Sequence, residues 1–248
     1  MTSGRAAIAL AALTACCCGA ATPAFAQPET SASIRPMFLP DRLGASTAFT
    51  LSLGFSGGAE GVPAPLSQVV VHLPAGLVIN LRGVGTCAKA QLERKGASGC
   101  PSGSLIGRGH ALLEVHAGSL TNPEEATVSV FRARNHGALP AFEIFGQGET
   151  PLDESTISTA VLGGGSAPYG LKLTVSVPPI PTLVFEPNAS FKSLSLTIGG
   201  VGRGPRAHTA AGAIVVPHSC PAGGFPFAAD FTFADESTAS TTANVPCP

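Results

Sequence analysis

Short stretches in which apolar and polar residues alternate recur along most of the chain, and they constrain its fold more than any other feature. The clearest is Thr47–Phe55, where Phe49, Leu51 and Leu53 alternate with threonine, serine and glycine. A period of two places every second side chain on one face of a strand, so each stretch predicts a half-buried strand. The other stretches are 66–73, 77–79, 105–116, 126–132, 141–145, 170–177, 193–198 and 225–233.

Turn-forming residues separate these stretches, since the chain has 30 glycines and 22 prolines but only 12% charged residues. About ten short strands with turns between them predict an all-β fold, an antiparallel β-sandwich. Residues 27–45 contain three prolines and are expected to form an extended leader. We expect residues 27–248 to form the sandwich region, with a possible boundary between two lobes near 147–168, where polar residues and a run of glycines occur.

One short helix is expected within this β-rich pattern, over Lys89–Lys95, where most residues favour helices. Thr86 is placed to cap its start and Gly96 to end it. In the strand that follows, Gly107 and Gly109 indicate a bulge or a close approach of another backbone.

Four cysteines follow the N-terminal segment, and an even number in an exported chain indicates disulfides. Of the three possible pairings, we favour Cys87 with Cys100 and Cys220 with Cys247, because each pair brackets a compact segment. The first bridge would tether the short helix, which would be marginal alone. A zinc site would need closely spaced cysteines of the CxxC type, and the sequence has none after this segment.

The first 26 residues have the pattern of an export signal. Arg5 precedes an apolar run at 6–15, and Ala24-Phe25-Ala26 is a small-x-small cleavage site. The run is shorter than the roughly 20 residues that span a bilayer. Removing 26 of the 248 residues leaves 222, a size that one all-β domain can reach. Secretion after this cleavage is the expected localisation.

A second interpretation of this segment stays open. Leu13-Thr14-Ala15-Cys16 has the order of a bacterial lipoprotein processing site, in which Cys16 would carry lipid and anchor the protein to the cell membrane. Cys17 and Cys18 have no role that the sequence assigns. The intact mass of the mature protein distinguishes lipidation from simple secretion.

The region around the first two cysteines resembles a group of uncharacterised exported proteins of actinobacteria. The shared pattern stands here as Leu73-Pro74-Ala75-Gly76-Leu77, then Asn80, then Cys87-Ala88-Lys89-Ala90-Gln91, then Cys100-Pro101 with Ser104 and Ile106-Gly107. The C-terminal Cys220-Pro221 and Pro246-Cys247 are similar too. The resemblance implies a β-rich surface or secreted architecture and the same cysteine pairing, but no reaction. Residues 110–170 match only in their alternation, and Ala88 replaces the usual serine or threonine.

No serine or histidine stands in a recognisable catalytic motif. A nucleophile elbow needs Gly-x-Ser-x-Gly, and the surroundings of Ser98, Ser104 and Ser166 all depart from it. His110 and His116 would share one face of a strand, but six residues at about 3.3 Å each separate them by about 20 Å. We therefore assign no catalytic residue, metal ligand or cofactor site from the sequence.

Three acidic pairs invite a calcium site, namely Glu124-Glu125, Asp153-Glu154 and Asp235-Glu236. None has the alternating ligand order of a calcium loop, so each is expected to lie in a solvated turn. The formal net charge of −1 and the lack of a basic patch argue against a nucleic-acid partner. The absence of tryptophan argues against aromatic platforms for sugars or single strands.

The leading hypothesis is a non-catalytic secreted or envelope-associated protein with a structural or adhesive binding role, whose partner is an unknown envelope or extracellular molecule. The first alternative is a secreted hydrolase with a non-standard site. The second is a lipid-anchored protein that binds a small ligand. Membrane contact is expected only through a lipid on Cys16.

Overall fold

The computed structural model describes residues 29–58, 61–117, 120–199 and 213–248. The expected signal segment with Cys16, Cys17 and Cys18, and the glycine-rich segment up to 212 with His208, lie outside these ranges. Within them the chain forms thirteen strands, one α-helix and two 3₁₀ turns. All strand pairings are antiparallel. The predicted all-β class is confirmed.

The elements follow each other along the chain without long irregular connections. Their bounds are β1 Ser31–Leu39, β2 Ser46–Ser56, β3 Leu66–Pro74, β4 Val78–Ile79, α1 Lys89–Lys95, the 3₁₀ turns Ala97–Gly99 and Ser102–Ser104, β5 Leu105–Ala117, β6 Leu120–Arg132, β7 Ala141–Thr150, β8 Ser155–Gly164, β9 Tyr169–Ser176, β10 Ser190–Gly199, β11 Ile214–Val215, β12 Phe225–Phe233 and β13 Thr238–Val245.

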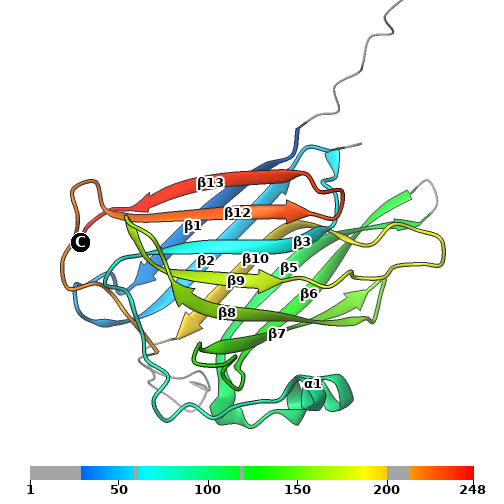
Figure 1. Cartoon of the computed structure of the whole chain (residues 1–248). Helices are drawn as coiled ribbons and strands as arrows, with labels where there is room; N and C mark the ends of the chain where they lie inside the picture. Colours follow the sequence, from blue (N-terminus) through cyan, green and yellow to red (C-terminus); the bar gives the residue numbers. More distant parts are fainter. Residues whose placement is uncertain (1–28, 59–60, 118–119, 200–212) are drawn as a thin grey trace, which may run out of the picture.

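The strands form one sheet that folds over on itself into a sandwich. Its order is β13-β12-β3-β9-β8-β7-β6-β5-β10-β2-β11-β4, and β1 pairs with the other edge of β2. In Figure 1, β13, β12, β3, β9 and β8 form the front layer, and β1, β2, β10, β5 and β6 cross behind them. β1 and β13 lie beside each other. The two layers therefore enclose a core along their whole length.

One half of this core is filled by phenylalanine side chains. The rings of Phe49 and Phe227 stack with centroids 5.5 Å apart, and Phe38 packs against both. Phe55 meets Phe231 edge to face at 4.9 Å. These residues come from β1, β2 and β12, so the aromatic half lies where the edges of the sheet approach each other.

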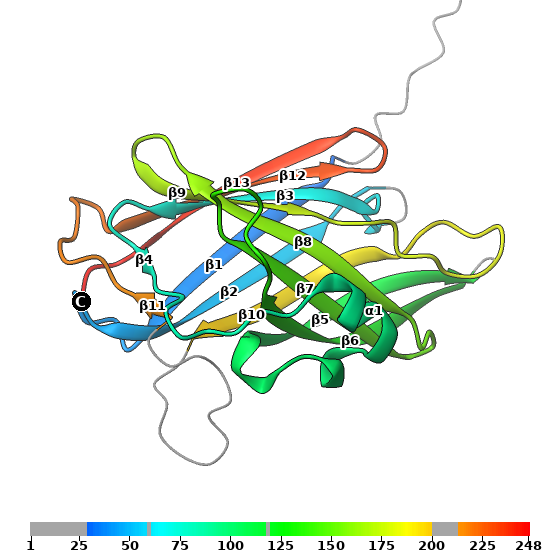
Figure 2. The same cartoon turned by 60° about the horizontal axis from the view of Figure 1, so that its bottom comes forward.

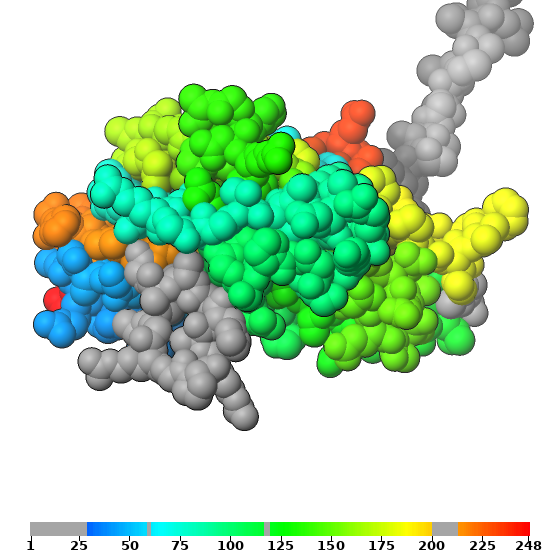
Figure 3. Space-filling view, turned by 90° about the horizontal axis from the view of Figure 1, so that it is seen from below, coloured from blue at the N-terminus to red at the C-terminus, as the bar shows by residue number. Residues whose placement is uncertain are grey.

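The helix α1 covers the outer face of the sheet where it bends through β6, β7 and β8, as the views from below show (Figures 2 and 3). Leu92 and Cys87 are buried there against Phe131, Phe145 and Ile157. The bounds of the helix agree with the prediction, but the Thr86 cap was wrong. The capping residue is Ala88, whose N–H donates to the side-chain oxygen of Gln91 at 3.2 Å.

Both favoured disulfides are present, Cys87–Cys100 and Cys220–Cys247. Disulfides are typical of proteins that fold in an oxidising compartment outside the cytoplasm. The one α-helix in the described ranges has seven residues, too few to cross a membrane.

Three strands occur where the alternation did not predict them. The expected leader contains β1, an edge strand that tolerates Pro36 because its outer edge makes no ladder. β8 and β13 also form regular strands. The range 147–168, where a lobe boundary was possible, contains the β7–β8 hairpin and the turn into β9, and the sheet continues across it.

The glycines of β5 mark both features that were predicted for them. The ladder between β5 and β6 shifts register between Leu105 and Gly107. At Gly109 a Cβ atom would lie only 2.1 Å from the carbonyl oxygen of Ser195 on β10. Any larger residue would push these two strands apart.

Candidate functional site

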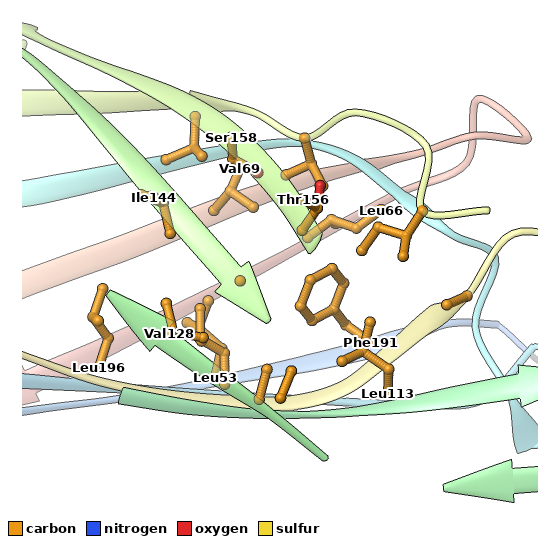
Figure 4. Close-up of a pocket in the computed structure, with 18 of the residues that line it drawn as sticks. Leu53, Leu66, Val69, Leu113, Val128, Ile144, Thr156, Ser158, Phe191 and Leu196 are labelled. Atoms are coloured by element: carbon orange, nitrogen blue, oxygen red, sulfur yellow. The ribbon is translucent and has the colours of Figure 1, made fainter. Parts of the chain in front are cut away.

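An apolar cavity lies between the two layers in the half of the sandwich without the phenylalanine cluster. Its volume is about 140 Å³, and it is partly open. Figure 4 shows Ile144, Val69 and Leu66 of one layer facing Leu53, Val128, Leu113 and Phe191 of the other across this space. An engineered cavity of about 150 Å³ in another protein stays dry and binds benzene or xenon, so this volume can hold a small apolar molecule.

The cavity exists because the strands on one side of it present small residues. On β5 and β6 the inward positions include Ala111 and Ala126. On β7 two inward positions are Gly146 and Gly148, and on β8 Ser158 faces inward. The other half places phenylalanine at the equivalent depth. A void forfeits contacts that close packing would give, and this one results from the identity of the side chains.

Four polar side chains reach the lining. Thr156 and Ser158 carry hydroxyl groups from β8, and Glu124 and Glu154 carry carboxyl groups. The lining contains no lysine, arginine or histidine. This composition suits a ligand that is apolar over most of its surface and uncharged or cationic at one end, because a buried anion would lack a counter-charge.

Glu124 is fixed at the end of the cavity by two backbone groups. Its side chain lies in β6 and is buried. Oε1 accepts a hydrogen bond from the N–H of Glu149, and Oε2 accepts one from the N–H of Leu152, both at 2.8 Å. Bonds from N–H groups to a carboxylate are among the stronger ones. Glu124 therefore holds the β7–β8 turn against the cavity.

This arrangement requires a glycine beside the carboxylate. A Cβ atom on Gly148 would lie 2.5 Å from Oε1 of Glu124 and 2.5 Å from the carbonyl oxygen of Leu152. Both are shorter than any real contact of this kind, so Gly148 lets the turn fold onto Glu124. The exposed Glu154 also lines the cavity, which places the mouth beside this turn.

The loop between β9 and β10 forms the opposite side of the mouth. Its residues Ile180 and Ala189 line the cavity, and the N–H of Ala189 donates to the carbonyl oxygen of Ile180 at 2.9 Å. The proline-rich connection around Ile180 is thus a connector between strands, as expected, and also part of the cavity wall.

Comparison with protein-family models, with curated proteins and with solved structures gives no match to this chain. The geometry of the cavity and the chemistry of its lining therefore carry the functional argument.

A second buried carboxyl group lies outside the cavity. Glu143 of β7 is buried on the outer face, where the hydroxyl of Thr159 donates to its Oε2 at 2.9 Å. Burial raises the pKa of Glu143 above its ordinary value, while the Thr159 hydrogen bond and the nearby charge of Lys89 oppose the shift. Its hydrogen-bond partner is a strand hydroxyl, and its place under α1 makes it a structural group.

The serines considered as nucleophiles have structural partners. The hydroxyl of Ser104 is fully buried and donates to the carbonyl oxygen of Pro101 at 2.6 Å. Ser98 donates to the carbonyl oxygen of Lys95 at 3.0 Å. In the described part of the chain, neither is hydrogen-bonded to a histidine. Both hydroxyls therefore act within turns, as the sequence indicated.

The histidines are dispersed over the outer surface. His110 and His116 lie on the outer face of β5. His72 on β3 shares a hydrogen bond of 2.9 Å with Asp230 on β12, and its ring lies 5.2 Å from that of Tyr169. Among the described residues, no group of three potential ligands is placed to hold a metal ion.

Of the acidic pairs, one was predicted wrongly. Glu124 lies in strand β6 and is buried, whereas a solvated turn was expected for it. Asp235 does lie in a turn, where the hydroxyl and N–H of Ser237 donate to its Oδ1 at 2.6 and 3.0 Å. The Ser237 hydroxyl bond lowers the pKa of Asp235. Asp153 is exposed and accepts a bond from Gln147.

Proposed function

We propose that this chain is an exported, non-catalytic protein that binds a small, uncharged, mainly apolar molecule inside its sandwich. The supporting observation is the 140 Å³ cavity, which small side chains of β5 to β8 leave open beside a densely packed aromatic half. Largely apolar pockets with a few polar groups are the usual form of small-molecule sites. The proposal narrows the binding role expected from the sequence to an internal ligand.

The hydroxyl groups of Thr156 and Ser158 define the polar part of the site. Each can donate or accept one further hydrogen bond to a ligand group. A ligand with one hydroxyl, ether or carbonyl group on an apolar body matches this pair. Glu124 and Glu154 disfavour a carboxylate, so free fatty acids and other organic anions are poor candidates.

Calorimetric titration with benzene, benzyl alcohol and benzoate tests the proposal, because the three share a ring and differ in one substituent. We expect saturable binding of benzene and benzyl alcohol, and at least tenfold weaker binding of benzoate at neutral pH. Binding of benzoate as tight as that of benzyl alcohol would contradict the electrostatic argument. No saturable binding of any of the three at millimolar concentration would contradict the function.

Localisation belongs to the same proposal. We propose that the protein is secreted after cleavage behind Ala26, with lipid attachment at Cys16 as the alternative. The mass of the mature protein distinguishes them, because a diacylglycerol group adds mass to a chain that begins at Cys16, whereas simple cleavage leaves a chain that begins at Gln27.

A further inference from the structure

The loop between β9 and β10 projects beyond the sandwich as a closed, well-formed hairpin. Below its tip, the hydroxyl of Thr182 donates to the carbonyl oxygen of Pro187 at 2.7 Å. At the tip, the N–H of Glu186 donates to the carbonyl oxygen of Leu183 at 3.1 Å and closes a turn. Figures 1 and 3 show this segment, in yellow, extending outward at the right of the molecule. The tip is therefore held in one shape by hydrogen bonds.

Three consecutive large apolar side chains form this tip and face solvent. Leu183 is 51% exposed, Val184 80% and Phe185 fully exposed. Phe185 has a φ of 69°, in the left-handed region that favours glycine and is unfavourable for a bulky residue. A phenylalanine at such a position gains nothing from packing within the sandwich. Unfavourable backbone geometry of this kind points to a functional role.

Other features at the same end of the molecule agree with a contact surface there. Ser190, which follows the loop, pairs with Glu114 near the end of β5. The β5–β6 hairpin therefore ends on the same side, and Leu120 beyond it is 65% exposed. The cavity mouth opens at this end too, since Ile180 lines it.

The described chain also starts at this end, because Ser31 pairs with Ser56 and the neighbouring Gly54 pairs with Ser193 at the start of β10. Twelve residues separate Glu29 from Cys16, and at about 3.5 Å each they span at most roughly 40 Å. A lipid on Cys16 would thus tether this end of the molecule, with its apolar tip, near a membrane.

The charge around the tip selects the kind of surface. Residues 177–190 contain no lysine or arginine, and their one charged residue is Glu186. Asp153 and Glu154 add negative charge at the mouth. An anionic surface would be repelled, whereas an uncharged or zwitterionic apolar layer would not. Three side chains radiating from a convex turn fit a soft lipid layer, which can surround them, better than a flat protein face.

We propose that the tip formed by Leu183, Val184 and Phe185 inserts into the interface of an electrically neutral lipid layer and brings the cavity mouth against it. The proposal concerns a surface separate from the cavity and does not depend on what the cavity binds. It adds a direct membrane contact to the lipid anchor that the sequence suggested.

The natural absence of tryptophan makes a direct test possible. In Phe185→Trp, the single indole should shift its emission to shorter wavelength when phosphatidylcholine vesicles are added, and brominated phosphatidylcholine should quench it. The matched control is Leu39→Trp, at the opposite end of β1, where the native side chain is 66% exposed. Its emission should not change. All proteins carry Cys16→Ser, so that no attached lipid contributes.

Vesicle flotation gives an independent measurement. Replacing Leu183, Val184 and Phe185 together by serine should lower partitioning onto phosphatidylcholine at least tenfold, whereas Met37→Ser with Leu39→Ser should leave it unchanged. Adding phosphatidylglycerol should weaken binding of the parent protein. Unchanged indole emission of Phe185→Trp at millimolar lipid would overturn the proposal, as would equal flotation of both serine variants. A blue shift that depends on protein concentration without lipid would instead indicate pairing of two copies and would also overturn it.

Discussion

Filling the cavity should weaken ligand binding without destabilising the protein, and Ala126→Leu is the substitution that shows this best. Ala126 is buried on β6 and its side chain lines the cavity between the layers. Leucine replaces a methyl group by an isobutyl group that extends into this space. We therefore expect alkylbenzene affinity to fall at least tenfold, while the free energy of unfolding stays constant or rises.

The expected magnitude follows from the size of the void. A 140 Å³ cavity costs about 3 kcal/mol at roughly 24 cal/mol per Å³. The three added carbons of leucine recover up to about 2 kcal/mol, at about 0.8 kcal/mol per buried methylene group. Imperfect fit of the new side chain lowers this gain, so the expected range is from no change to about 2 kcal/mol of added stability.

The matched control is Ala229→Leu, because Ala229 is also an inward alanine but lies on β12 among the buried phenylalanines. No space exists there, and overpacking should cost about 1–3 kcal/mol or more. Urea unfolding followed by far-ultraviolet circular dichroism measures both variants, and calorimetric titration with butylbenzene measures binding. Equal destabilisation by the two substitutions would mean that Ala126 has no usable space beside it. Undiminished butylbenzene affinity in Ala126→Leu would show that the ligand binds elsewhere.

Three further predictions concern the groups around this site and its framework. Glu124→Ala should destabilise the protein by about 2–5 kcal/mol in urea unfolding, because it leaves two buried N–H groups without an acceptor; a loss below 1 kcal/mol would mean that they find other partners. Burial raises the pKa of Glu143, so its contribution is fully present below the ordinary value near 4.3 and is lost as the pH rises through the raised pKa. Glu143→Gln should remove this fall in stability, and an unchanged pH profile would argue against it. Non-reducing peptide mapping should find Cys87 bonded to Cys100, and replacing both by serine should cost about 3 kcal/mol by the loop-entropy estimate; a Cys87 peptide linked to Cys220 would contradict the pairing.

The alternation of apolar and polar residues predicted most of the fold, because most strands have large apolar side chains facing the core. Thr47–Phe55 and Phe225–Phe233 are of this kind, and their bounds agree with β2 and β12 within a residue. The helix at Lys89–Lys95 was also found, since its composition and Gly96 act locally. These signals lie within a few residues of the element that they specify.

The strands that the sequence did not indicate have weak contrast for physical reasons. On β8 the inward positions include Thr156, Ser158 and Ala160, which are polar or small because they border or lie near the cavity. On β13 the inward side chains are mainly Ala239 and Ala243, which suit an edge strand. A cavity-lining strand thus lacks the pattern by which strands are recognised.

The candidate site itself could not be predicted from the sequence. Glu124 was assigned to a solvated turn because Pro123 precedes it and Glu125 follows it. Its burial depends on the N–H groups of Glu149 and Leu152, which only the folded sheet brings to it. The cavity likewise depends on small residues from four strands, and no local pattern shows that they face one another.

Methyl-group NMR during titration with butylbenzene is the decisive measurement for an internal ligand, because it reports where the ligand binds. We expect saturable shift changes for the methyl groups of Leu113, Val128 and Leu196, which line the cavity. Leu92 under α1 and Val216 near β11, both buried elsewhere, should not change. Saturable shifts at Leu92 or Val216 without changes at the cavity, or no saturable shifts at all, would contradict an internal ligand site.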